Sequence, residues 1–505
     1  MVKIRCRWIV VACILGLAGI AGYLHLPLPS ESIVPSVDTT RLLGPLKSDG
    51  TVDYVAFLDT QMREGVTAEN NAAGLLFKVG VFDVAPEQRV ELAGRYGLPK
   101  GGVSVDITLS AWQDHRETSQ ELAASKPEEG KDTRTSRRTP SVADAITAIE
   151  TDGLVPPQLE PWLEENALIL DLLSEASLRP KLYLSLISTT SRPLLADAWP
   201  KFMAKHTLNL MHALGARARF RAIANDAHGA CTDVLSLHRL ARLLDQAPDP
   251  LAAHMARAMD REAASAMVFI ATRCQLPPDE ARNLLGELTA MGPASVMSRS
   301  LDTHRFMLLD MVQMIIRGSS TKATSVSPNE MLCEVNRCLD ALELPLKSTD
   351  QPGAQVAQAL DAKQDAMALE AVSVGYVRLL WIGGRACRQE RSRITARALM
   401  GSQTPVFFRS ILSAEAHRQL EIAAVAITVF HAENGQYPQT LAALVPSVLK
   451  VLPVDPWTGQ ALKYVSREDG CQVYSVGPNG ADEGGSSGSC GDDVGLQISS
   501  IGAVR

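Results

Sequence analysis

AHGACTDVLSLHRLARLL, residues 227–244, is the stretch of sequence that decides the fold. Its apolar residues recur at alternating steps of three and four, at Ala227, Ala230, Val234, Leu237, Ala241 and Leu244. This spacing lays one apolar stripe along an α-helix, and such a stripe must be buried against a neighbour. Pro248 and Pro250 end the helix, and residues 252–270 repeat the pattern. Consecutive helices with short connections pack as hairpins.

The helical pattern extends outward over residues 49–400, which we expect to form a body of helical hairpins. Two short helices are predicted at its start, over residues 52–62 and 68–79. An irregular insert around residues 97–140 interrupts the pattern; residues 99–111 alternate as in a strand, and 127–140 are polar enough for a solvated loop. The fold class predicted for the chain is therefore mainly α.

The N-terminus carries the pattern of a membrane anchor. Lys3, Arg5 and Arg7 precede an apolar run, residues 8–26, without Asp, Glu, Lys, Arg or Pro. A helix of this length spans about 28 Å, close to the thickness of the hydrocarbon core. The basic flank places residues 1–7 in the cytoplasm. We expect residues 1–26 to form a signal anchor, with one transmembrane helix in the inner membrane.

The rest of the chain is then exported to the periplasm. Residues 27–48, rich in proline and serine, are expected to form an extended stalk. A cleaved signal peptide stays open as the alternative, because Gly19 and Ala21 offer small residues at a suitable spacing.

The composition excludes several classes of function. Of the 505 residues 21% are charged and 5% aromatic, and the formal net charge is -7, which argues against nucleic acid as a partner. The nine cysteines include no CxxC pair. The zinc-protease, phosphate-loop and dinucleotide-binding motifs are absent from the sequence. A protein that is not an enzyme is therefore expected.

The C-terminal part, residues 413–505, has a different pattern. A long helix is predicted from Ala414 to Asn434, with Gly435 as its stop. Residues 461–465 and 471–476 are short β-rich runs, and the Asp469-Gly470 pair between them indicates a hairpin. A small α+β module is expected here, in which the long helix covers one face of a short antiparallel sheet.

Three motifs follow one another in this module: NGQYP at 434–438, PVDPWTG at 453–459 and YSVGPNG at 474–480. Over residues 414–498 their order resembles the globular module of the major pseudopilins of type II secretion systems. In those proteins the module directly follows the N-terminal membrane helix, whereas almost 390 residues intervene here. The layout of the whole chain also resembles an uncharacterised family of membrane-anchored bacterial proteins, a likeness that implies no activity.

The resemblance to pseudopilins implies a calcium ion in the C-terminal loop. The matching positions are Ser475, Asn479, Asp482, Asp492 and Asp493. Carboxylate, hydroxyl and carbonyl oxygens are the donors that calcium prefers. The chain departs from the pattern at Asn479, where pseudopilins usually carry an aspartate, and by one extra residue before Gly484.

An oxidising compartment would also allow a disulfide between Cys471 and Cys490, closing a loop of about twenty residues. Together these features predict an envelope-exposed scaffold or interaction protein, attached to the membrane through residues 8–26 and binding an envelope protein. Two alternatives stay open, an exported hydrolase and an accessory protein of a secretion apparatus. A deep pocket with two titratable side chains within hydrogen-bond reach would favour the hydrolase.

Overall fold

The structure is a computed structural model of the chain. It describes residues 31–83, 91–92, 94–96, 141–186, 194–198, 201–202, 204–247, 250–274, 276–292, 297–318, 326–346, 351–373, 384–399, 403–467, 470–486 and 492–499. The predicted anchor, the strand at 99–111 and the loop at 127–140 lie outside these residues. Among the helices that the structure describes, none is both long and apolar enough to cross a membrane.

The chain forms two compact units, each built from three separate segments. The first comprises Met1–Gln61, Leu186–Trp199 and Met297–Arg409, and the second comprises Met62–Ser185, Pro200–Val296 and Ser410–Arg505. The predicted helical body is thus divided between two units, and the C-terminal module belongs to the second one together with much of that body.

The first unit is helical. Its helices are α2 (Tyr54–Arg63), α9 (Leu195–Ala198), α14 (Met297–Gly318), α15 (Pro328–Leu346), α16 (Gly353–Ser373) and α18 (Gly384–Leu399). Helix α15 packs against α14, α16 and α18. Two ion pairs fasten α15 to α18, Glu330 with Arg393 and Glu334 with Arg397, each at 2.7 Å.

The segment 27–48, predicted to be an extended stalk, contacts α15 over part of its described residues. The Nδ2 of Asn336 in α15 donates to the backbone oxygens of Asp38 and Thr39, both at 2.8 Å. The backbone N–H of Val34 donates to Asn329 Oδ1 at 2.9 Å. A segment without secondary structure leaves backbone groups unpaired, and two asparagines of α15 satisfy them here. The proline and serine content alone did not show this.

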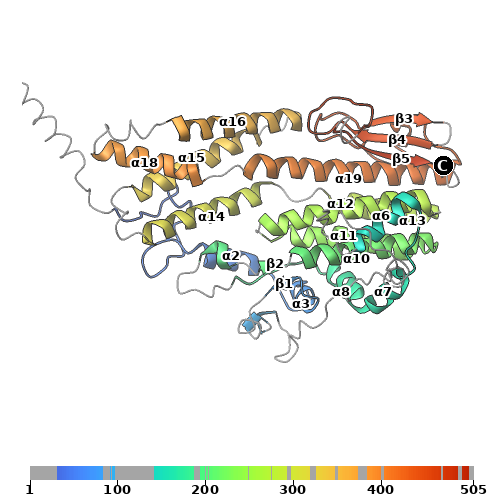
Figure 1. Ribbon diagram of the computed structural model, residues 1–505, viewed down its shortest axis with the longest axis horizontal. Helices are drawn as coiled ribbons and strands as arrows, with labels where there is room; N and C mark the ends of the chain where they lie inside the picture. Colours follow the sequence, from blue (N-terminus) through green and yellow to red (C-terminus); the bar gives the residue numbers. More distant parts are fainter. Residues whose placement is uncertain are drawn as a thin grey trace, which may run out of the picture. The chain divides into compact units, whose positions relative to one another are not determined.

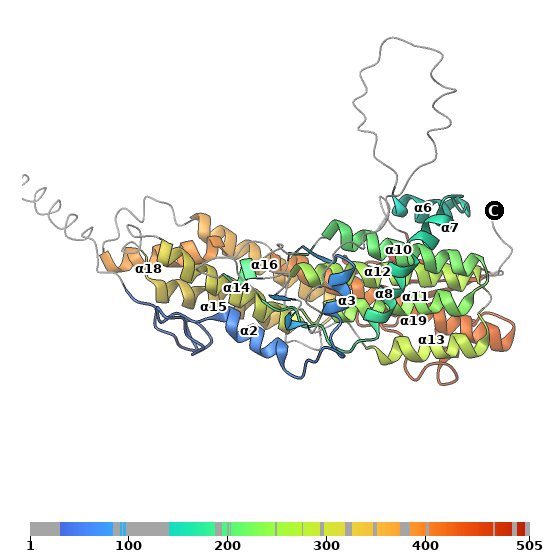
Figure 2. The ribbon, with the colours of Figure 1, turned by 90° about the horizontal axis from the view of Figure 1, so that it is seen from below.

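The second unit contains most of the remaining helices. They are α3 (Ala73–Lys78), α6 (Val142–Asp152), α7 (Leu159–Glu165), α8 (Ala167–Ser177), α10 (Ala204–Ile223), α11 (Ala227–Leu244), α12 (Pro250–Arg273), α13 (Pro278–Ala290) and, from Ser410 onward, α19 (Gln403–Asn434). Helices α10, α11 and α12 pack on one another, and both Figure 1 and Figure 2 show them side by side. The apolar stripe of α11 is buried apart from the half-buried Ala227. The mainly helical fold class is confirmed.

The turn between α10 and α11 follows from three residues. Asn225 adopts a left-handed conformation, with φ at 58°, which asparagine tolerates better than most residues. Asp226 then caps α11, its Oδ1 accepting from the backbone N–H of Gly229 at 2.9 Å. A Cβ at Gly229 would lie only 2.1 Å from Asp226 Oδ2. The glycine therefore makes room for the capping carboxylate.

A small sheet completes the second unit. Strands β3 (Lys463–Arg467), β4 (Gly470–Ser475) and β5 (Val494–Ser499) are antiparallel in the order β3-β4-β5. The predicted hairpin is β3 and β4, so the small antiparallel sheet is confirmed, and β5 is a strand that the sequence analysis did not predict. A short 3₁₀ helix, Leu441–Leu444, precedes the sheet, and β1 (Phe82–Asp83) pairs with β2 (Lys201–Phe202) elsewhere in the unit.

Buried charges tie the helices of the second unit together. Arg219 in α10 is fully buried and donates to Glu150 of α6 at 2.6 Å and to Glu262 of α12 at 2.7 Å. Its Nη1 also donates to the backbone oxygen of Gly215 at 3.0 Å. A Cβ at Gly215 would lie 2.2 Å from Glu262 Oε1, so only glycine leaves space for this ion pair.

A second buried cluster surrounds Asp233 of α11, whose carboxylate is inaccessible to solvent. Arg217 Nη2 donates to it at 2.7 Å, and Arg221 Nη1 at 2.8 Å. Burial raises the pKa of Asp233, and the hydrogen bonds and charge of Arg217 counteract that rise. The carboxylate and the two guanidinium groups therefore compensate one another's charge in this buried cluster.

His238, also in α11, lies buried between two carboxylates. Its Nδ1 is 2.9 Å from Asp260 Oδ1 of α12, and its Nε2 is 2.9 Å from Glu421 Oε1 of α19. Two carboxylate acceptors require a proton on each ring nitrogen, so the imidazole is cationic. Burial alone would lower the pKa of His238, but the charge of Glu421 and the hydrogen bonds to both carboxylates raise it to about 9.

The Asp233 cluster leads to a first prediction. Asp233→Ala leaves the buried Arg217 without its main partner, and loss of one member of a buried ion pair destabilises by about 3–5 kcal/mol. We expect a decrease of that size in the free energy of unfolding of the second unit, measured by urea titration. The control is Glu287→Ala, which removes the half-exposed partner of Arg239 and should change stability by about 1 kcal/mol or less. Similar losses in both variants would contradict the prediction.

The His238 pair of contacts leads to a second prediction, on pH dependence. The pKa in the folded state, about 9, lies above the reference value of 6.5. Protonated His238 therefore makes its full contribution to the free energy of unfolding below about pH 6.5. This contribution, roughly 3 kcal/mol, is lost as the pH rises through 9. His238→Gln carries no proton that titrates in this window. We expect the unfolding free energy of the variant to decline less steeply between pH 6.5 and 9, and parallel pH profiles would refute the assignment.

Candidate metal centre

The candidate site lies in the loop between β4 and β5, whose ends meet at the edge of the sheet. Ser475, the last residue of β4, is paired with Val494, the first of β5. The described residues of the loop therefore start and finish side by side. Burial and hydrogen bonds at this edge fix where the acidic side chains of the loop can lie.

Asp455 anchors this end of the sheet and was missed as an important residue by the sequence analysis. Its buried carboxylate accepts from the backbone N–H groups of Trp457 and Val476, both at 2.9 Å, and from Ser475 Oγ at 3.0 Å. Its position in an Asp-Pro turn was the available signal. Asp455 joins the turn before β3 to the start of the loop.

Gly477 brings the two ends of the loop into contact. Its φ is 70°, a left-handed conformation that favours glycine, and a Cβ there would lie 2.2 Å from the backbone oxygen of Asp492. The backbone N–H of Asn479 donates to Asp492 Oδ2 at 3.0 Å. Asp492 is thereby held against the opposite end of the loop.

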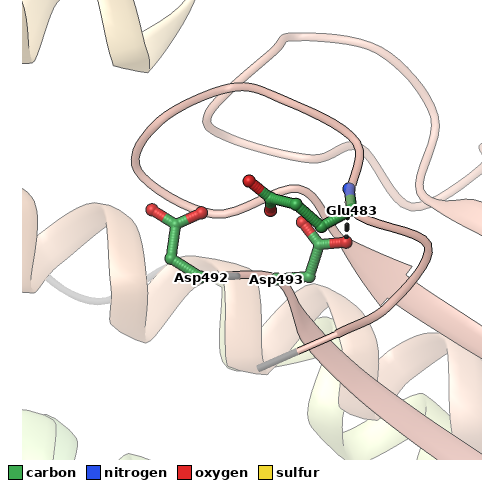
Figure 3. Close-up of side chains that lie close together, drawn as sticks. All are labelled: Glu483, Asp492 and Asp493. Atoms are coloured by element: carbon green, nitrogen blue, oxygen red, sulfur yellow. Dashed lines mark hydrogen bonds between the residues drawn. The ribbon is translucent and has the colours of Figure 1, made fainter. Parts of the chain in front are cut away.

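Three carboxylates converge inside the loop, those of Glu483, Asp492 and Asp493, as Figure 3 shows. One oxygen from each lies within 4.8 Å of the others. Asp493 is almost completely buried, and its Oδ2 accepts from the backbone N–H groups of Glu483 at 3.0 Å and Gly485 at 2.7 Å. The backbone of residues 483–485 therefore wraps around the Asp493 carboxylate.

Each of the three carboxylates keeps one buried oxygen without a hydrogen-bond partner among the described residues. These atoms are Glu483 Oε2, Asp492 Oδ1 and Asp493 Oδ1. Burial raises the pKa of Asp493, and its contact with Glu483 adds to the rise. Carboxylates held this close repel one another, and buried oxygens without partners are unfavourable; a divalent cation counteracts both effects.

Two of the five residues predicted for this site, Asp492 and Asp493, lie in the cluster. The other three are not members of it. Ser475 is bonded to Asp455, and Asp482 to Tyr474 at 2.9 Å and Lys463 at 3.1 Å. Asn479 contacts the cluster from outside, donating from Nδ2 to Glu483 Oε1 at 2.5 Å. Asn479 therefore positions Glu483 by a hydrogen bond.

Glu483 was not among the predicted ligands. The signal available in the sequence was its place directly after Asp482, a predicted ligand.

The predicted disulfide stays a prediction. Cys471 is a buried free thiol in β4, and Cys490, its expected partner, lies outside the described residues. Burial raises the pKa of Cys471. A thiol in this environment is protonated at neutral pH and is a poor nucleophile.

The chemistry of the site is that of binding a hard cation. All three converging atoms are carboxylate oxygens, the donor type that calcium and magnesium select, and the cluster includes no imidazole or thiolate that would favour a transition metal. Comparison of the chain with protein-family models, with curated proteins and with solved structures found no match.

Proposed function

We propose that this protein is a membrane-anchored, envelope-exposed interaction protein without enzymatic activity, whose C-terminal loop is stabilised by calcium. The observation that carries the calcium part is a cluster of three carboxylates, with one oxygen of each within 4.8 Å of the others, in which each carboxylate also has a buried oxygen without a hydrogen-bond partner among the described residues. The anchor is supported by residues 8–26 and their basic flank. The interaction role is supported by the ordinary charge balance of the chain and by the absence of zinc-protease, phosphate-loop and dinucleotide-binding motifs from its sequence.

The residues that would hold the ion are Glu483, Asp492 and Asp493. Calcium takes six to eight oxygen ligands in flexible geometry, so the three carboxylates would leave positions for water or backbone oxygens. Magnesium demands near-octahedral geometry and gives up its waters reluctantly. A loop with glycines at both sides of its acidic cluster suits the larger and more tolerant ion.

The ion would act on structure. It would join residue 483, in the middle of the loop, to residues 492 and 493, which lead into β5. Because β5 is the strand at the end of the sheet, this crosslink would secure the third strand. A ligand that binds only the folded state raises its stability in proportion to the logarithm of ligand concentration.

The calcium prediction is tested with the purified full-length chain. Thermal unfolding should move to higher temperature in about 5 mM calcium relative to chelator, and less in magnesium, because extracellular calcium modules bind with dissociation constants of about 0.1–1 mM. Glu483→Gln and Asp492→Asn should each abolish most of the shift. In chelator these variants should be as stable as the parent, or more so, since each removes one repelling charge.

Asp482→Asn provides the matched control. Asp482 is in the same loop but is engaged by Lys463 and Tyr474 outside the cluster, so the variant should keep the calcium response. Absence of a shift in the parent chain, or equal loss in the control, would refute the metal centre.

The topology prediction is tested with fusions. Alkaline phosphatase fused after Arg505 should be active, because the enzyme matures only after export. Green fluorescent protein fused at the same position should stay dark if the general export route carries the chain across the membrane. Deleting residues 8–26 should abolish the phosphatase activity. Resistance of the fusion to carbonate extraction distinguishes a retained anchor from a cleaved signal peptide. Fluorescence together with inactive phosphatase would contradict the proposed location.

A further inference from the structure

A groove of about 410 Å³ lies between β5 and the helices of the second unit. Four consecutive residues of β5, 494–497, line one side of it. Helix α12 lines the other side, with Arg261, Ser265 and Phe269, and α19 contributes His417. None of these residues is among the three carboxylates of the proposed metal centre, although β5 directly follows Asp493 in the chain.

Arg261 is the unusual member of this groove. It is half-buried, yet it forms no hydrogen bond or ion pair with any residue that the structure describes. Burial lowers the pKa of Arg261, and Asp260, next to it in the chain, opposes the shift. The carboxylate of Asp260, however, is bonded to His238 and Arg242. Other arginines of α10 and α11 have carboxylate partners, so the groove contains a cation without one.

The other polar groups of the groove do not supply the missing negative charge. The Glu150 carboxylate is occupied by Arg219 and by the Ser265 hydroxyl, which donates to it at 3.0 Å. His417 donates from Nδ1 to the backbone oxygen of Ser413 at 2.7 Å, which leaves its Nε2 without a partner among the described residues. The Arg261 charge adds to burial in lowering the pKa of His417, so the two groups are close enough to interact.

The strand that lines the groove is at the end of the sheet. In the order β3-β4-β5, the backbone of β5 pairs with β4 on one side. On its other side, β5 makes no backbone hydrogen bond with a described residue. Alternate residues of such an edge strand direct N–H and C=O groups outward, where an extended peptide can add as a further strand.

We infer that this groove binds an extended peptide of a partner protein, which adds to the edge of β5 and places a carboxylate on Arg261. The main-chain pairing would provide affinity along residues 494–497. The guanidinium would form a charge-assisted bidentate pair, and Phe269 and Leu420 would contact apolar side chains of the peptide. This inference rests on the interaction role proposed above; it uses none of the three carboxylates of the metal centre and does not require the anchor.

The test starts with the full-length chain and a displayed library of random dodecapeptides with free carboxyl termini. Selected peptides are synthesised, and their dissociation constants are measured by fluorescence polarisation. Arg261→Gln should weaken binding by about tenfold or more, the loss expected for a charge-assisted pair. Arg239→Gln, a variant in α11 outside the groove, should bind as the parent does.

Three peptide modifications identify the contacts. N-methylation at every second residue should abolish binding in one register and be tolerated in the other, because only alternate N–H groups face β5. Loss of binding on terminal amidation assigns the carboxylate to the peptide end, and loss on replacing Asp or Glu by the amide assigns it to a side chain.

Several results would overturn the inference. They are a library without selected peptides, equal binding to Arg261→Gln, tolerance of N-methylation at every position, or indifference to both carboxylate changes. Self-association of the chain that competes with the peptides would reassign the groove to a second copy. A retained calcium shift in Arg261→Gln shows that the variant is folded, and it separates failure of this site from failure of the metal centre.

Discussion

Arg219 is buried completely among α6, α10 and α12, and the second unit is arranged around that charge. A guanidinium in this position is tolerable only if carboxylates and carbonyls surround it, and Glu150, Glu262 and Gly215 do so. Glu150 lies on α6, Glu262 on α12 and Gly215 on α10 itself. The positions of these polar contacts therefore help to set how the three helices cross, together with apolar packing. At Gly215 the backbone of α10 lies so close to the ion pair that even a methyl group would displace Glu262.

The same principle joins the C-terminal helix to the rest of the unit. His238 bridges α11, α12 and α19, and its partner Glu421 is 183 residues away in the chain. α19 is in turn followed by the sheet and the acidic loop. The resemblance to a pseudopilin module suggested a separate C-terminal domain, whereas the buried imidazolium makes the long helix of that module part of a larger core.

The sequence predicted what depends on local periodicity. The apolar stripe of α11, the short helices near the start of the body and the hairpin of β3 and β4 all follow from spacing within a few turns or a few residues. Strand β5 was missed because its sequence, VGLQIS, is short and follows a glycine-rich segment. In the site, Asp492 and Asp493 were predicted and Glu483 was not, because a loop brings its acids together through hydrogen bonds such as that from Asn479, which have no fixed sequence spacing. The buried ion pairs were unpredictable for the same reason, since their partners are remote in the chain.

The division of the chain into interleaved segments has a consequence for biogenesis. The second unit needs residues from the first third of the chain and from its last fifth, and Glu421 completes the environment of His238 only when α19 arrives. A chain that emerges from its amino end therefore cannot close this core until nearly all of it has been delivered. Until then α10, α11 and α12 expose charged and apolar faces that lack their final partners. For an exported chain, this delay would keep the polypeptide unfolded during passage and would place the folding step on the far side of the membrane.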